Sequence, residues 1–354
     1  MEKLFCVVMV IILNNLRMEA VTINRTKLQP VSGEKIPLLN LTCPLDRKDI
    51  PLNKNWSKRP WTIPTSYPEF VDRALDFKVR YDDIWILGQQ KTGTTWMQDM
   101  AWLITHNFDF KTSENSHVYE RSVNLEYTGV YQPFAGTEAE KKGVSSFAAT
   151  ENMTSPRIIK SHLSPNMLPK ELWTKKPKVI YLTRNVKDSA VSLYHMYKGL
   201  KYFDGTKEQF LDALMTDSLA YCPYWPHILE FWEMRNESNI FFISYERIKR
   251  DLRGSFKEIS EFLENPCSDD ILDKAVDHLS FQSMKNSKAG QTLQKIMEDI
   301  HGTSGEFKFI RRGEIGSHKD ELPEGYSEKM DNWSERSLVG SGVAMDDILS
   351  FSYK

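Results

Sequence analysis

The segment from Gly88 to Trp96, GQQKTGTTW, has the composition of an anion-binding loop. A glycine-rich turn that leads into a helix presents free backbone N–H groups to an anion. Lys91 adds a positive charge, and the threonines add hydroxyl donors. The lysine lies inside the loop, whereas a Walker A loop places it directly after the second glycine. We therefore expect a bound phosphate-like group, or alternatively a plain strand–helix turn with a capping threonine. Trp96 belongs either to the core or to a stack on a base.

A lysine and a histidine follow the apolar pair Ile158–Ile159. A lone histidine is more often structural than catalytic. His162, however, lies two residues beyond Lys160, where an apolar run ends. Near pH 7 a histidine with an unperturbed pKa of about 6.5 is mostly neutral and can accept a proton. His162 is therefore a candidate general base.

Further basic residues follow other apolar runs. Arg184 comes directly after VIYLT, and Ser192 lies two helical turns further on, so both can face one phosphate. Alternatively, Arg184 and Asp188 form a weak surface pair. Arg311 and Arg312 stand before a glycine near the C-terminus. Two adjacent arginines are commonly solvated, but with Arg184 they would suffice for a second phosphate.

The elements that must position these residues alternate between strand and helix. Four short runs are apolar on both faces, as strands buried in a parallel sheet are: Ile84–Leu87, Ile158–Ile159, Val179–Leu182 and Ile240–Ile243. Three helical patterns follow such runs: Thr94–His106, Lys187–Leu200 and Tyr245–Leu263. The pattern predicts an α/β fold with a central parallel sheet flanked by helices on both faces. Ligands bind at the carboxyl ends of such strands, where the basic residues lie.

The first 60 residues differ from the rest. Residues 1–20 form an apolar segment that includes Leu4–Leu13. This run is shorter than the roughly 20 residues of a membrane-spanning helix, so no transmembrane span is expected, but it has the length of a signal-peptide core. Residues 21–60 lack a clear period and carry several prolines, which predicts an irregular arm. A short helix is expected between Pro68 and Phe77, within one catalytic domain over residues 61–354.

The amino-acid composition limits the classes of binding partner that we expect. The 354 residues are 40% hydrophobic and 27% charged, with 46 Lys and Arg against 48 Asp and Glu. A net charge of −2 provides no global basic field for nucleic acid, so we expect no nucleic-acid partner and a local site for a small anion. The four cysteines form no CxxC pair and suggest a reducing compartment. The sequence shows no His/Cys/Asp cluster for a metal.

Taken together, these segments resemble the cytosolic sulfotransferase family from about Tyr67 to Trp333. The family motifs YPKSGTTW, KTHLP, RNxKDxxVSxYH, FYED, SFxxMK and RKGxxGDW are matched in order by GQQKTGTTW from Gly88, KSHLSP from Lys160, RNVKDSAVSLYH from Arg184, SYER from Ser244, SFQSMK from Ser280 and RRGEIGSH from Arg311. The resemblance implies a P-loop-like fold that binds 3′-phosphoadenosine-5′-phosphosulfate (PAPS) as the sulfuryl donor. It also implies a small-molecule acceptor with a hydroxyl or amine, and no metal.

The resemblance also implies roles for individual residues. His162 would take the acceptor's proton, Lys91 would stabilise the bridging oxygen of the leaving group, and Lys160 would serve the sulfuryl oxygens. The 5′-phosphosulfate would be held by Lys91, Thr92, Gly93, Thr94 and Thr95. The 3′-phosphate would be held by Arg184, Ser192, Arg311, Arg312 and Gly313, with Lys187 as a further basic residue. The adenine would be sandwiched by Trp96 and Phe281, with Tyr245 at its edge and Met284 nearby in the SFxxMK motif.

The sequence departs from the family pattern in several places. Gln90 replaces a proline before Lys91, which could loosen the loop, and Leu279 replaces a hydroxyl residue on the adenine side. Ser317-His318 replaces Asp-Trp. The family's C-terminal dimer motif is not recognisable in Lys319–Glu324, so the oligomeric state is open. The charged stretch Glu138–Lys142 would border the acceptor pocket, so the acceptor type is not inherited.

Several functional readings remain open. We expect sulfuryl transfer to a small apolar or phenolic acceptor. Aromatic residues that could line its pocket are Tyr119, Tyr127, Tyr131, Phe134, Tyr221 and Trp225. The alternatives are a PAPS-dependent dehydratase, a silent ligand-binding relative and, less favoured, a P-loop nucleotide kinase, which would need Mg²⁺ and a strand-end carboxylate.

The signals for compartment conflict. The family resemblance and the cysteine usage favour the cytoplasm. The run Leu4–Leu13 favours a signal or anchor, and six N-x-[ST] sequons are consistent with the secretory route: Asn24, Asn40, Asn55, Asn152, Asn236 and Asn332. We expect a cytoplasmic protein, with the secretory pathway or Golgi lumen as the alternative.

Overall fold

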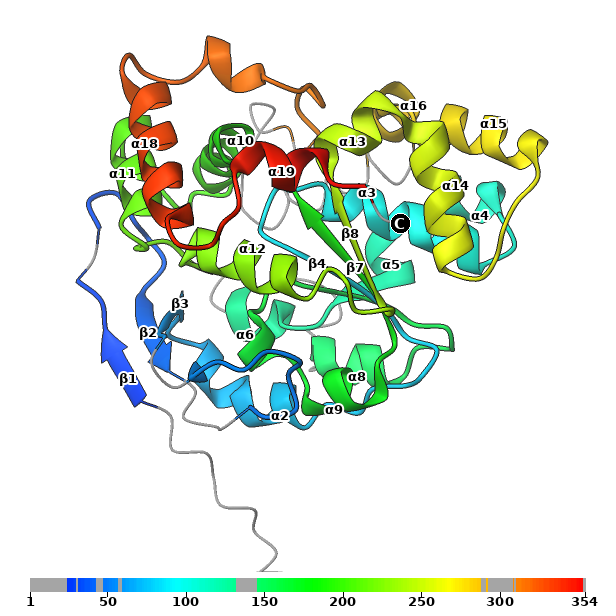
Figure 1. Ribbon diagram of the computed structural model, residues 1–354, viewed down its shortest axis with the longest axis horizontal. Helices are drawn as coiled ribbons and strands as arrows, with labels where there is room; N and C mark the ends of the chain where they lie inside the picture. The colour runs from blue at the N-terminus through cyan, green and yellow to red at the C-terminus, as the bar shows by residue number, and fades with distance from the viewer. Residues whose placement is uncertain are drawn as a thin grey trace, which may run out of the picture.

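Five parallel strands form the central sheet (Figure 1). The computed structural model describes residues 24–29, 31–42, 47–56, 59–131, 145–287, 291, 308 and 310–352. In space the strands run in the order β5 (Ser122–Asn124), β6 (Ile158–Ser161), β4 (Ile84–Gly88), β7 (Lys178–Thr183) and β8 (Ile240–Ser244). Every neighbouring pair is parallel, so the carboxyl ends of the strands share one edge. The predicted α/β fold is confirmed, and β5, a strand of three residues, is the one that the sequence did not indicate.

Side chains that alternate along β4 enter two different cores, which explains why the run is apolar on both faces. Trp85 and Leu87 lie in the larger core, whereas Ile84 and Ile86 lie in the smaller one. The helices that contribute to the smaller core include α3 (Thr94–Thr105), α14 (Leu252–Phe262) and α15 (Asp269–His278). Those that contribute to the larger core include α2 (Val71–Leu75), α9 (Lys170–Lys175), α10 (Val186–Gly199) and α12 (Tyr224–Glu233). Helices thus cover both faces of the sheet.

The helix expected over Tyr245–Leu263 is two helices. The first, α13, spans Tyr245–Arg250, and α14 begins at Leu252. Asp251 between them has φ −142°, which no helix accommodates, and its carboxylate accepts a hydrogen bond from the N–H of Gly254 at 2.8 Å. An aspartate that caps the second helix therefore separates two segments whose apolar periodicity looks continuous.

The remaining helices range from short turns to the 13-residue α18. They are η2 (Tyr67–Phe70), α4 (Phe110–Asn115), α5 (Val118–Arg121), α6 (Tyr127–Tyr131), α8 (Ser146–Glu151), η4 (Pro165–Met167), α11 (Lys207–Met215), α16 (Phe281–Asn286), η5 (Ser317–Asp320), α18 (Tyr326–Leu338) and α19 (Met345–Ser350). The short helix expected between Pro68 and Phe77 is the pair η2 and α2. In the ranges that the structure describes, no helix is both long enough and apolar enough to cross a membrane.

A second, antiparallel sheet lies in the segment expected to be an irregular arm. Its strands are β1 (Asn24–Lys27), β2 (Leu38–Thr42) and β3 (Trp61–Pro64), in that order. β2 pairs with β1 on one side and with β3 on the other. The strands have five residues or fewer and are separated by proline-containing loops, so no period was visible in the sequence. The segment forms a sheet instead of an irregular arm because each strand is stabilised by pairing with a partner distant in the sequence. Such pairing leaves no periodic pattern in the local sequence.

Candidate functional site

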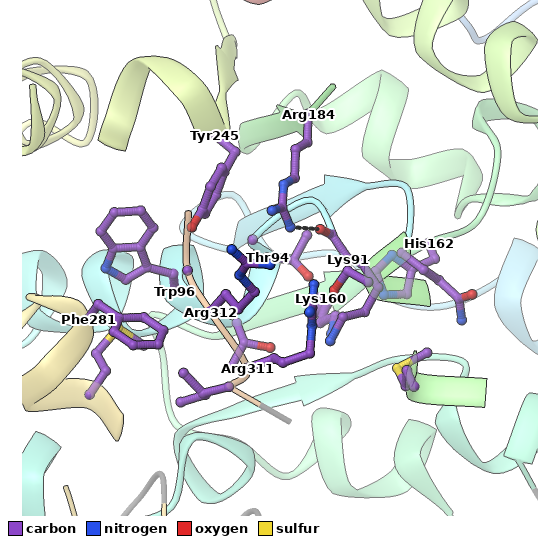
Figure 2. A pocket seen from close by; sticks show the side chains of 18 of the residues that line it. Lys91, Thr94, Trp96, Lys160, His162, Arg184, Tyr245, Phe281, Arg311 and Arg312 are labelled. Carbon is purple, nitrogen blue, oxygen red and sulfur yellow. Dashed lines mark hydrogen bonds between the residues drawn. The ribbon is translucent and has the colours of Figure 1, made fainter. Parts of the chain in front are cut away.

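One cavity at the carboxyl ends of β4, β6 and β7 gathers most of the residues that the sequence singled out. Its lining includes Lys91, Gly93, Thr94, Thr95, Trp96, Lys160, His162, Arg184, Ser192, Tyr245, Phe281, Met284, Arg311, Arg312 and Gly313. Figure 2 shows Trp96, Phe281 and Tyr245 at one end, Lys160 and His162 at the other, and Arg184 and Arg312 between them. The polar and aromatic predictions therefore converge on a single elongated site.

The anion loop joins β4 to α3 through two residues with positive φ. Lys91 has φ +65°, and Gly93, the N-cap of α3, has φ +99°. A Cβ on Gly93 would press against the ring of Tyr245, so only glycine fits. Thr92 differs from the expectation for this loop. Its side chain is fully buried, does not line the cavity, and donates to the carbonyl of Gln89 at 2.8 Å, so its hydroxyl holds the loop together.

The two lysines of the site have lowered pKa values. Burial, together with the positive charges of Lys160, Arg184 and Arg311, lowers the pKa of Lys91 to about 7. Burial also lowers the pKa of Lys160 to about 8, against the opposing effect of the buried Glu126 carboxylate. A cluster of cations with few anions nearby is a site that stabilises bound negative charge.

His162 is held in one orientation by two hydrogen bonds. Its Nδ1 lies 2.6 Å from the carbonyl oxygen of Gly88, and its backbone N–H donates to Oε1 of Glu126 at 2.7 Å. Because a carbonyl can only accept, Nδ1 carries the proton and Nε2 keeps its lone pair. Burial, followed by the charge of Lys160, holds the pKa of His162 well below its usual range. The ring is therefore a neutral base with a defined tautomer.

Arg184 connects three parts of the site. Its guanidinium donates to the carbonyl of Lys91 at 3.1 Å and to that of Glu314 at 3.3 Å, and it stacks over the Tyr245 ring at 4.3 Å. Its buried Nε has no hydrogen-bond partner among the described residues. These contacts fix the guanidinium in the wall of a basic site, with one donor left unpaired.

The paired arginines contact carboxylates on the segment that follows them. Arg311 pairs with Glu321, and Arg312 contacts Glu314 at 3.0 Å and Asp320 at 2.9 Å. The Arg312 side chain is about one-third exposed, so its pairs are screened by solvent. Local ion pairs therefore orient both arginines, which remain at the cavity wall.

Trp96 is fixed by the residue that departs from the family pattern. Its indole N–H donates to the carbonyl of Leu279 at 3.0 Å, and its ring meets the Tyr245 ring edge-on at 5.8 Å between centroids. The Leu279 side chain is fully buried in the smaller core. Gly313 passes so close to Phe281 that a Cβ there would overlap the ring, and its φ is +65°. The aromatic end of the site is therefore built by packing, and Leu279 acts through its backbone.

The segment that carries Arg311 and Arg312, here called the strap (residues 310–318), is fastened to α10 by Asp188. This fully buried carboxylate accepts from the backbone N–H of Gly316 at 2.7 Å and of His318 at 2.9 Å, and it lies 2.9 Å from Nδ1 of His318. The alternative of a surface pair between Asp188 and Arg184 is therefore wrong. His318, which replaces the family's tryptophan, supplies part of the fastening.

Lys187 does not line the cavity, contrary to the expectation that it is one of the basic residues of the site. Its Nζ lies 3.1 Å from the hydroxyl of Ser327 and 2.8 Å from the carboxylate of Asp331, both on α18. Lys187 is the second residue of α10, and its side chain extends to α18 rather than into the cavity. Its charge therefore serves the packing of α18 on α10.

Sequence reasoning missed much of the apolar end of the cavity. The further lining residues are Gln90, Asn124, Met196, Leu200, Tyr202, Lys249, Ile310 and Ser317, together with Tyr119 and Tyr127 from the aromatic list. Met196 and Leu200 follow Ser192 at intervals of four, so helical spacing could have found them. Gln90 is buried in the loop wall.

Two further aromatic candidates, Tyr221 and Trp225, do not line the cavity. Tyr221 contacts the ring of His162 edge-on at 5.5 Å between centroids, whereas Trp225 packs in the core against Trp333. The side chains of Tyr131 and Phe134, and the segment Glu138–Lys142, lie outside the described residues.

Comparison with known proteins agrees with this geometry. The family model "Sulfotransferase domain" matches residues 81–342. Luciferin sulfotransferase of Photinus pyralis is 29% identical over 80% of this chain and 79% of its own length. Sulfotransferase 1E1 of Mus musculus is 32% identical over 77% of this chain and 88% of its own length.

Solved structures share the fold. A retinol dehydratase crystallised with androsterone and the inactive cofactor PAP has a TM-score of 0.78 and 19% identity, over 92% of this chain and 99% of its own. Mouse sulfotransferase SULT7A1, crystallised with PAP, has a TM-score of 0.61 and 24% identity, over 80% of this chain and 94% of its own. Since the family model covers most of the chain and its motifs converge on one cavity, the chain belongs to the sulfotransferase family.

Proposed function

We propose that this sulfotransferase moves the sulfuryl group of PAPS to a hydroxyl or amine of a small apolar or phenolic acceptor, with His162 as the base. One observation carries the proposal. A neutral histidine, fixed through Nδ1 to the Gly88 carbonyl, shares a cavity with two buried lysines, and an aromatic and arginine-rich wall lies opposite. The acceptor and the donor would thus meet between His162 and Lys91.

The residues present fit PAPS. The start of α3 offers backbone N–H groups and the hydroxyls of Thr94 and Thr95 to the 5′-phosphosulfate. Arg184 has an unpaired, buried Nε, and it would hold the 3′-phosphate together with Ser192, Arg311 and Arg312. Trp96 and Phe281, with Tyr245 beside them, would hold the adenine. When bound, PAPS supplies the sulfuryl group and a leaving group that departs as a phosphate.

His162, Lys91 and Lys160 would each have a separate role in the transfer. Nε2 of His162 accepts the proton of the acceptor hydroxyl, and the Nδ1–H bond to Gly88 stabilises the imidazolium that results. Lys91 and Lys160 neutralise the charge that develops on the leaving and equatorial oxygens. The fixed positions of these groups lower the entropic cost of alignment.

Sulfate transfer tests this proposal directly. Recombinant protein is incubated with labelled PAPS and a panel of phenols, alcohols and amines, and product masses separate sulfate esters from dehydrated products. We expect His162→Ala to lower turnover roughly 10²-fold or more, because the base is lost. His106→Ala, at the far end of α3, is the control and keeps full turnover.

Two results would contradict the proposal. Absence of transfer across the whole panel, despite tight binding of PAP by calorimetry, would refute the activity. Unchanged turnover of His162→Ala would refute the role of His162 alone.

We also propose that the protein resides in the cytoplasm. Cys222 and Cys267 are free thiols, which supports a reducing compartment. The competing signal is that the sequon asparagines Asn55, Asn152, Asn236 and Asn332 are all exposed. Expression with a C-terminal tag and digestion with a glycosidase distinguishes the two, because a shift in mobility would place the chain in the secretory pathway.

A further inference from the structure

Asn124 places a carboxamide beside the reacting groups. It is the last residue of β5, and its Cα pairs with that of Lys160 on the parallel neighbour β6. Paired residues on adjacent strands lie about 4.8 Å apart and project to the same face of the sheet. Both side chains line the cavity, as does His162, two residues beyond Lys160. The backbone of Asn124 is therefore one strand spacing away from that of Lys160, in the wall of the same cavity.

This carboxamide is buried without a full set of partners. Asn124 is 7% exposed, and its Oδ1 has no hydrogen-bond partner among the described residues. Besides the charged Lys160, the same cavity is lined by the apolar or phenolic side chains of Tyr119, Met196 and Leu200. An unpaired buried amide destabilises a folded chain, and a leucine of similar size would not. A bound molecule with a matching polar group would remove this deficit.

We propose that Asn124 selects acceptors that carry a second hydroxyl or amino group close to the reacting one, such as dihydroxyarenes. The inference rests on the proposed function of the site and names its substrate class. The second group donates to Oδ1 of Asn124 while the first reaches Nε2 of His162. Because Asn124 pairs with Lys160, two residues before His162, we expect both groups on one ring or on two fused rings.

Binding and turnover test the inference separately. The probes are 2-naphthol and the 2,3-, 2,6- and 2,7-dihydroxynaphthalenes, each titrated by calorimetry into the PAP-loaded protein, and each assayed for sulfate transfer. We expect at least one diol to bind tenfold or more tightly than 2-naphthol, since a hydrogen bond to a buried acceptor is at stake. Asn124→Leu should reduce this preference to the twofold statistical advantage of two equivalent hydroxyls. Asn152→Leu, at an exposed position, serves as the matched control and retains the preference.

Thermal denaturation adds a readout that activity cannot mimic. Asn124→Leu should melt at the same temperature as the wild type or higher, because an unpaired amide is replaced by an apolar group. A clear drop in melting temperature would show that the amide has a structural partner and would overturn the inference.

The remaining outcomes separate the two proposals. Equal binding of diols and 2-naphthol would overturn the selectivity of Asn124. A uniform loss of turnover on all acceptors in Asn124→Leu, with diol preference intact, would assign Asn124 to the donor and overturn it as well. Diol preference in binding without any sulfate transfer would uphold the inference and refute the proposed activity.

Discussion

At the scale of single residues, the site keeps its base neutral and leaves its lysines poised to gain charge. Burial lowers all three pKa values, because it disfavours the charged form of histidine and lysine alike. For His162 this is useful over the whole neutral range, since a base must be unprotonated. For Lys91, with a pKa of about 7, the charge is only partly present near neutral pH. An anionic ligand restores it.

Donor binding should therefore take up protons. A bound polyanion raises the pKa of Lys91 from about 7 and of Lys160 from about 8 toward ordinary lysine values. Between about pH 7 and pH 9 the free protein has fewer protons than the complex, so affinity for PAP falls as pH rises through this window. Lowering the pH toward 6 should not weaken binding through these groups. Calorimetry of PAP binding at pH 8, in buffers of different ionisation enthalpy, measures the uptake.

The lysine responsible can be identified by substitution. Lys91→Met should remove a large part of the proton uptake at pH 8, whereas Lys198→Met, which removes a lysine bonded to the Asp204 carbonyl, leaves it in place. Equal observed enthalpies in all buffers would mean that Lys91 and Lys160 are already fully protonated in the free protein.

At the scale of elements, the strap and α10 form one functional unit. α10 carries Ser192 toward the cavity and holds Asp188 one turn earlier on its buried side. Burial raises the pKa of the Asp188 carboxyl, but hydrogen bonds from His318 and Gly316 outweigh it and hold the pKa at about 2, so the carboxyl stays ionised at any pH at which the protein works. The charge is used to accept four hydrogen bonds from the strap, which carries Arg311 and Arg312.

Loss of that charge should weaken recognition of the 3′-phosphate in particular. Asp188→Asn keeps the side-chain size but weakens the bonds to Gly316 and His318, so the strap loosens. We expect PAP affinity to fall roughly tenfold or more, in line with the loss of charged hydrogen bonds. Affinity for adenosine 5′-phosphosulfate, which lacks the 3′-phosphate, should change much less. Asp331→Asn, which removes the partner of Lys187 on α18, is the matched control. An equal loss for both nucleotides would show that Asp188 supports the whole fold.

Sequence pattern predicted the elements whose signal is local. β4 and β7 are apolar on both faces, and the loop between β4 and α3 carries its chemistry in consecutive residues. Asn124 and Tyr202 could not be assigned this way, because they reach the cavity through β5, a strand of three residues, and through a loop after α10. Thr92 is a residue for which the sequence predicted a contact that the structure does not show. A threonine fits an anion-binding loop, but the hydroxyl of Thr92 donates to the carbonyl of Gln89 inside the loop. Tertiary geometry decides such cases.

At the scale of the whole molecule, the N-terminal sheet belongs to the same folded unit as the active site. Leu41 of β2 and Ile63 of β3 lie in the same core as Trp85 of β4. Arg47 is buried and donates to the carbonyls of Asn166 at 2.6 Å and Leu168 at 3.1 Å, which ties its segment to the turn before α9. The family model begins only at residue 81, so the packed core extends beyond the part of the chain that the family model matches.

Removal of this sheet should therefore destabilise the catalytic core. A chain that begins at Arg59 lacks β1 and β2, leaves β3 without its partner, and exposes the side chains that packed on Ile36, Leu39, Leu41 and Trp56. Each buried side chain of this size contributes about 1.5–3 kcal/mol, so the loss would approach the whole stability of an ordinary domain, about 5–15 kcal/mol. We expect the truncated chain to melt far below the full chain or to fail to fold.

The point variant Leu41→Ala should lower the free energy of unfolding by about 2–5 kcal/mol in chemical denaturation, and Lys27→Ala on the exposed edge of β1 should lower it by almost nothing. A truncated chain that melts at the normal temperature and binds PAP normally would show that the sheet is an appendage. A large loss of stability in the truncated chain, an intermediate loss in Leu41→Ala and none in Lys27→Ala would show that the N-terminal segment is part of the folded scaffold.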